Sequence, residues 1–248
     1  MILRRLSRLL KEQNWTAIWI EFVLLVAGVF LGIQAANWNA ARVDRIEYEA
    51  ALGRLGAEID INLAALDAFD PEMARSLKVA SRALTVLQSC VDNEENRRVV
   101  EAGLEEIRGT SGLQLRRNAL SEMTSNPRLL SQQTAEQRKR FSELLFYFES
   151  LQTEADFLER QPQERRMEDN PVLRVGAAHA YSSKYLGFDW ATTRRRLELD
   201  VPLDVACHDN MLIKTFFNWE RRQGGLPVIA QKWRVELMAT KQLIEARQ

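Results

Sequence analysis

The sequence predicts an all-α membrane protein in which an N-terminal transmembrane helix continues into a stalk and is followed by an antiparallel helical bundle. An apolar run from Trp15 to Trp38 contains Glu21 as its one charge. As a helix it reaches about 34 Å, enough to cross a hydrocarbon core of about 30 Å. Beyond it, apolar residues recur at spacings of three and four, without convincing alternation of period two. We therefore divide the chain into an N-terminal segment (1–14), a span (15–38), a stalk (39–69) and an extramembrane domain (70–248).

Composition limits the classes of partner. The chain has 34 basic and 34 acidic side chains among 248 residues, so the formal net charge is zero and no global field favours nucleic acid. The two signs are interleaved along most of the chain, as on solvated helix faces. About two hundred residues outside the membrane suffice to bury a core. The lipid bilayer is the first partner that we predict, and we expect neither a nucleic-acid partner nor a cofactor.

Segment 1–14 carries apolar and basic side chains in a pattern that fits an amphipathic helix. The apolar residues that can share one face are Ile2, Leu3, Leu6, Leu9 and Leu10. The basic residues on the remainder are Arg4, Arg5, Arg8 and Lys11. This pattern is typical of a helix lying on an anionic leaflet, and a frayed basic tail is the alternative. Together with Trp15 and Trp38, whose indole rings suit the two water–lipid interfaces, the four basic residues are the predicted membrane anchors.

We interpret the apolar run as an uncleaved anchor rather than a signal peptide. It is longer than a usual signal core, and Ile33-Gln34-Ala35 is a poor cleavage site. Four basic residues precede the span, against Arg42, Arg45 and Arg54 soon after it. This bias favours a cytoplasmic N-terminus and a C-terminal domain outside, in the periplasm of a Gram-negative cell. The expected location is the bacterial inner membrane, crossed once.

One face of the span combines an acid with small residues. At 100° per residue, the following side chains lie within about 40° of one line: Glu21, Leu25, Gly28, Gly32, Ala35 and Asn39. Gly28 and Gly32 have the small-xxx-small spacing that lets two membrane helices approach closely. We expect a helix–helix contact on this face, either with a second copy or with another membrane protein.

Glu21 itself has three interpretations. It reaches water at the cytoplasmic interface, or it is a structural acid that is protonated or hydrogen-bonded to a neighbouring helix. The third interpretation is a proton-handling acid, as in accessory subunits of ion-driven, stator-like complexes. Those subunits usually carry an aspartate deeper in the span, and their exported domains are not all-helical.

Residues 21–39 also carry a recognisable sequence pattern. They read Glu-Phe-Val-Leu-Leu-Val-Ala-Gly-Val-Phe-Leu-Gly-Ile-Gln-Ala-Ala-Asn-Trp-Asn, so a glutamate opens the apolar run and Gln-x-x-Asn-Trp-Asn closes it. This stretch resembles the anchor signature of a group of uncharacterised bacterial single-span membrane proteins. A weaker similarity covers residues 118–130 and the helix expected near 141–148. The resemblance implies one span followed by a helical extramembrane region, and it implies no activity.

Helical patterns continue after the span. Apolar residues of the stalk recur at threes and fours from Leu52 to Leu66, and Asp70-Pro71 is expected to end that helix. The later prolines mark plausible boundaries between helix-forming stretches. Thr134 and Gln137 fit a capping box that precedes a long apolar face. These features predict a bundle that is antiparallel where connections are short.

The residue types that support catalysis or metal binding are few. Cys90 and Cys207 form a disulfide if the domain is exported, or remain two buried thiols. Cys207 and His208 are adjacent and diverge by about 100° on a helix, so we expect no metal site and no cysteine–histidine nucleophile with His179. The run 194–196 of three arginines, beside acidic residues, is interpreted as a solvated face, and a binding patch for an acidic partner is the alternative. Trp190, Trp219 and Trp233 are expected in the core or at an interface.

The function predicted first is a membrane-tethered helical interaction or scaffold module that self-associates or serves as an accessory subunit. The small-residue face of the span and the stalk stripe support it. The second is a periplasmic ligand-sensing domain that signals through a separate partner, because the cytoplasmic part is too short for an output domain. An enzyme is not expected, since no catalytic constellation is visible.

Overall fold

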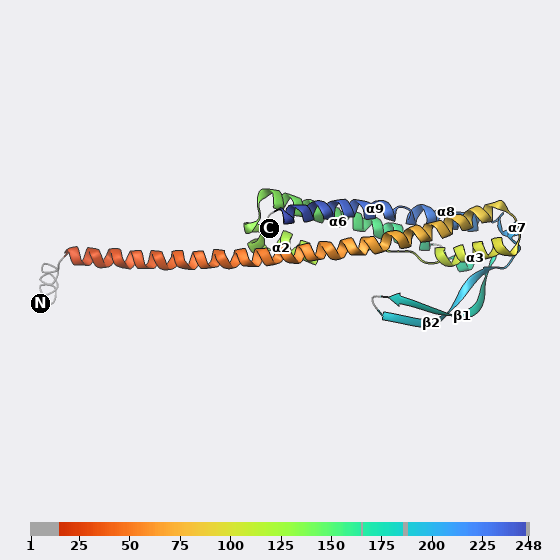
Figure 1. Ribbon diagram of the computed structural model, residues 1–248, viewed down its shortest axis with the longest axis horizontal. Coiled ribbons are helices and arrows are strands. Elements are labelled where there is room, and N and C mark those ends of the chain that lie inside the picture. Colours follow the sequence, from red (N-terminus) through yellow and green to blue (C-terminus); the bar gives the residue numbers. More distant parts are fainter. Residues whose placement is uncertain (1–14, 165, 186–187, 247–248) are drawn as a thin grey trace, which may run out of the picture.

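The computed structural model describes residues 15–164, 166–185 and 188–246. The molecule is elongated: one long helix runs along most of it, and the remaining elements cover the second half of that helix (Figure 1). The described helices are α2 (Trp15–Ser89), α3 (Glu94–Ile107), α4 (Asn118–Ser125), α5 (Pro127–Gln132), α6 (Ala135–Arg160), α7 (Leu203–Ala206), α8 (Asn210–Gln223) and α9 (Leu226–Glu245). Two short 3-10 turns, η1 (Gln161–Glu164) and η2 (Met167–Asp169), and a hairpin of β1 (Leu173–Tyr185) and β2 (Phe188–Leu199) complete the fold.

The long helix α2 joins the apolar segment to the bundle without a break. Its side chains from Trp19 to Val43 are exposed. Tyr48 is the first residue after this stretch that is buried. From there onward one side of α2 packs against α3, α4, α5, α8 and α9. The segment 39–69 is therefore not a free stalk, because most of it is a helix of the bundle.

The prediction that Asp70-Pro71 ends this helix is wrong, since α2 continues through Pro71 to Ser89. A proline in a helix interior removes one hydrogen bond and crowds the carbonyl four residues earlier. Leu66 and Met73, on either side of Pro71, are both fully buried in the same core. Tertiary packing on both sides of the proline thus keeps the helix in one piece.

Local signals at helix ends agree with the structure. Thr134 and Gln137 form the predicted capping box at the start of α6. Asn93 and Asp209 cap α3 and α8 with their side chains. The start of α4 is capped from another helix: the buried Glu58 carboxylate of α2 accepts hydrogen bonds from the backbone N–H groups of Ala119 (2.9 Å) and Leu120 (3.1 Å).

Two apolar clusters share α2. The cluster nearer the span joins α2 to α4, α5, α6 and α9, with Phe141 and Trp233 among its fully buried members. The farther cluster joins the end of α2 to α3, α7, α8 and the base of the hairpin, with Phe216 and Trp219 at its centre. A Cβ added at Gly103 of α3 would lie 2.2 Å from the Cβ of Ala83, so this cluster requires glycine there.

Ion pairs fasten α9 to its neighbours. Glu236, which is buried, lies 2.8 Å from Arg140 of α6 and 2.6 Å from Lys232. On the flank of α2 that faces α9, Arg234 pairs with Asp67 and Asp70, and Lys241 pairs with Asp60 at 2.6 Å. These contacts fix the register of α9 on α2.

The fold is mostly helical, as predicted, but it is not all-α. Strands β1 and β2 pair antiparallel. Leu173 lies opposite Leu199 at one end and Tyr185 lies opposite Phe188 at the other, with an irregularity between Val175 and Ala178. Among the described residues only the base of this hairpin is buried, through Leu173, Gly176, Leu197 and Leu199. The rest projects from the bundle as an arm (Figure 1).

Candidate interaction surfaces

The face predicted for a helix–helix contact lies fully exposed on α2. All six of its residues, Glu21, Leu25, Gly28, Gly32, Ala35 and Asn39, are solvent-accessible in the isolated chain. A Cβ added at Gly28 or Gly32 would meet nothing within 4 Å. Another helix can therefore approach this face to backbone contact, as small-residue positions allow.

The predicted membrane anchors are described only in part. Trp38 is 69% exposed and projects from α2 at the end of the apolar run. Trp15 begins α2, but its side chain lies outside the description, as do Arg4, Arg5, Arg8 and Lys11 of segment 1–14. Among the described residues, α2 is the one helix that is long and apolar enough to cross a membrane, with a mean hydropathy of 2.0 in its most apolar window.

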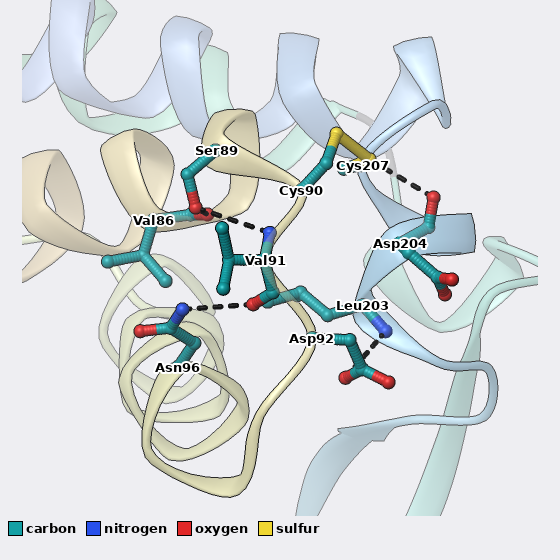
Figure 2. Close-up of a disulfide and its surroundings, with 9 residues drawn as sticks. All are labelled: Val86, Ser89, Cys90, Val91, Asp92, Asn96, Leu203, Asp204 and Cys207. Atoms are coloured by element: carbon teal, nitrogen blue, oxygen red, sulfur yellow. Dashed lines mark hydrogen bonds between the residues drawn. A yellow bond between two sulfur atoms is a disulfide. The ribbon is translucent and has the colours of Figure 1, made fainter.

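The two cysteines lie at the end of the molecule far from the span, and they are joined. A disulfide links Cys90, directly after α2, to Cys207, directly after α7, with the Cα atoms 5.4 Å apart (Figure 2). Beside it, the backbone N–H of Leu203 donates a hydrogen bond to the Asp92 carboxylate at 3.2 Å. Cys90 has φ of 53°, the left-handed conformation that often follows a helix. The chain therefore reverses after α2 and is tied there to α7.

The disulfide also limits the chemistry of its neighbours. Ligand atoms of Cys90, Cys207 and the exposed His208 lie within 4.8 Å of one another, closer than the sequence spacing suggested. Both sulfurs are bonded to each other, so neither is a thiolate that binds a metal or attacks a substrate. His179 lies on β1, where its Nε2 accepts a hydrogen bond from Arg196 Nε at 3.2 Å.

The three-arginine run lies on strand β2, not on a helix. The guanidinium group of Arg194 stacks 3.8 Å from the ring centre of Tyr181 and 5.5 Å from that of Trp190. Trp190 is half-exposed, unlike Trp219 and Trp233, which are buried. The Arg195 carbonyl accepts a hydrogen bond at 2.7 Å from Arg108, the residue directly after α3. The arm thus presents a basic and aromatic face held against the bundle at its root.

A polar cleft of about 630 Å³ separates this arm from α2 and α3. Side chains of both signs line it: Glu72, Arg75, Glu105, Glu106, Arg108, Tyr181 and Arg194. Arg75 donates hydrogen bonds across it to Glu72 (2.9 Å) and Glu106 (3.2 Å). The hydrogen bond to Glu72, together with the charge of Glu106, raises the pKa of the Arg75 guanidinium. The charges of the cleft are largely paired with each other.

Comparisons of this chain with protein-family models, with curated proteins and with solved structures find no match.

Sequence reasoning missed the arm and the cleft beneath it. The alternation of Leu197 and Leu199, both buried, is the period-two signal at the base of β2. It is too short to stand out beside the charged residues that precede it. In contrast, the span face was visible in the sequence because a helix of 3.6 residues per turn makes it periodic.

Proposed function

We propose that this chain is a single-pass membrane protein whose helical domain serves as an interaction or scaffold module, either self-associating or as an accessory subunit of a membrane complex. One observation carries the proposal: α2 runs unbroken from its exposed apolar half into the core of the bundle. Apolar side chains exposed along a whole helix need lipid or another apolar surface around them.

The bilayer that we propose is the bacterial inner membrane, with the N-terminus in the cytoplasm and the bundle in the periplasm. The excess of basic residues before the span supports this orientation. The Cys90–Cys207 disulfide supports it independently, because disulfides persist in oxidising compartments and are rare in the cytosol.

With the apolar half of α2 in a bilayer, as proposed, the two ends of the bundle lie at different heights above the membrane. Tyr48 follows Asn39 by nine residues, or about 14 Å of helix, so the bundle begins close to the bilayer. Cys90 follows Asn39 by 51 residues, about 77 Å, so the disulfide and the root of the hairpin lie far from it. A scaffold of this shape holds its arm where lipids do not reach.

The test begins with the native protein in its own membrane. Extraction at alkaline pH without detergent should leave the chain in the membrane pellet, and chemical crosslinking with mass spectrometry should capture copies of the chain or one abundant membrane protein. Replacing Gly28 and Gly32 with isoleucine should weaken the crosslinking, whereas the same replacement of Val23 and Phe30, which point about 160° to 180° away from this face, should not. Release of the chain by alkali, or an absence of crosslinks, would refute the proposal.

A second candidate is a ligand-sensing domain, which the charged cleft between the arm and α3 favours. Lined by residues of both signs, this cleft suits a small polar molecule that carries both charges. Stabilisation of the full chain by amino acids or similar zwitterions, lost when Arg75 is replaced by alanine, would support sensing over scaffolding. An unchanged melting temperature across such a ligand panel would count against it.

A further inference from the structure

Outside the membrane, the face of α2 that points away from the bundle is apolar. It is formed by Val43, Ile46, Ala50, Gly53, Ala57, Ile61, Ala64 and Ala68, all of them exposed. Val43, Ile46 and Ile61 remain 51%, 56% and 44% exposed. A Cβ added at Gly53 would meet nothing within 4 Å. Three branched aliphatic residues and five alanine or glycine residues thus leave about 38 Å of helix surface without a polar side chain, which is an unusual surface to expose to water. We refer to these eight residues as the outer stripe.

The outer stripe continues the face predicted in the span. At 100° per residue, every member from Glu21 to Ala68 lies within about 40° of one line. The two halves are related by 18 residues, or five helical turns, so that Gly28 corresponds to Ile46 and Ala35 to Gly53. One straight helix face therefore extends for about 70 Å, first through lipid and then through water.

The neighbouring elements of the bundle leave the outer stripe open. On one flank, Asp60 and Asp67 form ion pairs with Lys241 and Arg234 of α9. On the other flank, Arg54 pairs with Glu122 of α4 at 2.7 Å. The core side of α2, represented by Leu55, points in roughly the opposite direction. Within the described chain, nothing lies between these flanks to cover the stripe.

Between residues 42 and 54, the part of the outer stripe nearest the membrane, the flanking charges alternate in sign. Arg42 and Glu49 lie on one flank, and Glu47 and Arg54 lie on the other. In a parallel pair of helices, one flank of the first helix faces the other flank of the second, about five residues further along. Arg42 then meets Glu47 of the second copy, and Glu49 meets its Arg54. Both contacts join opposite charges, and the two-fold axis repeats each of them.

We infer that the outer stripe is the seam of a parallel, in-register dimer in which α2 of one copy packs along α2 of a second copy. The inference rests on the proposed function, because anchoring both copies in one membrane makes their helices parallel. Small residues at Ala50, Gly53 and Ala57 permit close approach of the two backbones. A contact about 70 Å long and about 9 Å wide covers roughly 600 Å² per copy, or about 1,200 Å² in total, at the lower end of the range for stable interfaces.

Cysteine crosslinking in native membranes tests the seam. The full chain with Ala57→Cys should form a disulfide-linked dimer when the oxidant copper phenanthroline removes the two thiol hydrogens and two electrons. The matched control is Ala41→Cys, an exposed alanine of the same helix that points about 160° away from the stripe. We expect at least tenfold more dimer from Ala57→Cys than from Ala41→Cys. Equal yields would overturn the inference.

A charge exchange between two copies tests the register and the identity of the occupant. Glu49→Arg places arginine opposite Arg54, and Arg54→Glu places glutamate opposite Glu49, so each variant alone should lose most of the Ala57→Cys crosslink. Co-expression of the two variants, carrying different tags, restores opposite charges and should restore the crosslink between unlike copies. If the mixture of the two variants does not regain the crosslink, this register is excluded. If either variant alone keeps the crosslink at the original yield, the charge contacts are excluded.

These outcomes separate the inference from the function on which it rests. If the chain stays in the alkali-washed membrane and crosslinks to another protein while Ala57→Cys and Ala41→Cys behave alike, the interaction module stands and the dimer seam falls. If alkali releases the chain, both fall. If chains that carry Ala57→Cys together with Gly28→Ile and Gly32→Ile still form the crosslinked dimer, the outer stripe associates without the glycine face of the span.

Discussion

Removing the disulfide should be the most destabilising change that leaves every helix intact. The bond joins residues separated by 117 positions, so it closes a loop that contains α3 to α7. For such a loop the chain-entropy relation gives about 16 cal/mol/K, or about 4.9 kcal/mol at 25 °C. The double variant Cys90→Ser with Cys207→Ser should lose stability of this order, and residual structure in the unfolded chain makes the figure an upper bound.

The assay is thermal unfolding of the detergent-solubilised full chain, followed by circular dichroism at 222 nm. For a protein of this size, each kcal/mol shifts the Tm by about 2–4 °C, so the loss should be about 10–20 °C. The wild-type chain treated with a reductant should unfold at the temperature of the double variant. A double variant that melts within about 2 °C of the oxidised wild type would refute the reasoning.

The left-handed backbone at Cys90 refines this prediction. Glycine adopts φ of 53° without the steric cost that a side chain brings. Cys90→Gly with Cys207→Ser should therefore recover about 1 kcal/mol relative to the double serine variant, although neither has a crosslink. Equal Tm values would show that the conformation after α2 does not require a glycine-like residue.

Three further predictions concern the bundle. Burial raises the pKa of the Glu236 carboxyl, but hydrogen bonds from Lys232 and Arg140 outweigh it and lower the pKa overall. The stabilisation is thus present above about pH 4.5 and is lost as the pH falls through the native pKa, so Glu236→Gln should flatten the acid limb of a Tm-against-pH curve. Gly103→Ala should lower the Tm by several degrees because of its clash, whereas Gly56→Ala, where a Cβ meets open space within α2, should raise it by about 1–3 °C. Glu58→Ala should cost about 2 kcal/mol in urea unfolding, because it leaves two N–H groups of α4 without their acceptor, and Glu58→Gln should cost less.

The sequence predicted the features that depend on local pattern. The apolar length of α2, the capping box at Thr134 and the helical faces all follow from spacing within one helix. The continuation through Pro71 could not be predicted this way, because the residues that hold it, Leu66 and Met73, act by contacts with distant helices. The rule that a proline ends a helix considers only local structure. In α2, core packing on both sides of Pro71 outweighs the cost of the proline.

The hairpin illustrates the opposite limitation. A strand shows alternation when one face is buried and the other is wet, but most of this arm has no buried face. Its arginines at 194–196 are solvated, as they would be on an exposed helix face. Their polarity therefore does not tell a strand from a helix. The cleft and the cation–π stack of Arg194 on Tyr181 form only because β1 pairs with β2. They could therefore not be predicted from the sequence either.

The apolar segment and the bundle share one continuous helix, α2, so a contact made by either part constrains the orientation of the other. Within the described residues, α2 alone belongs to the apolar segment and to both core clusters, and the disulfide ties its far end to α7. A contact that fixes the rotation of the span therefore also fixes the direction in which the arm projects. A seam along α2 would hold two arms in a defined relation above the membrane, and a partner that grips the arms would in turn set the spacing of the spans. In the accessory role that we propose, such a body would transmit position between the arm and the span.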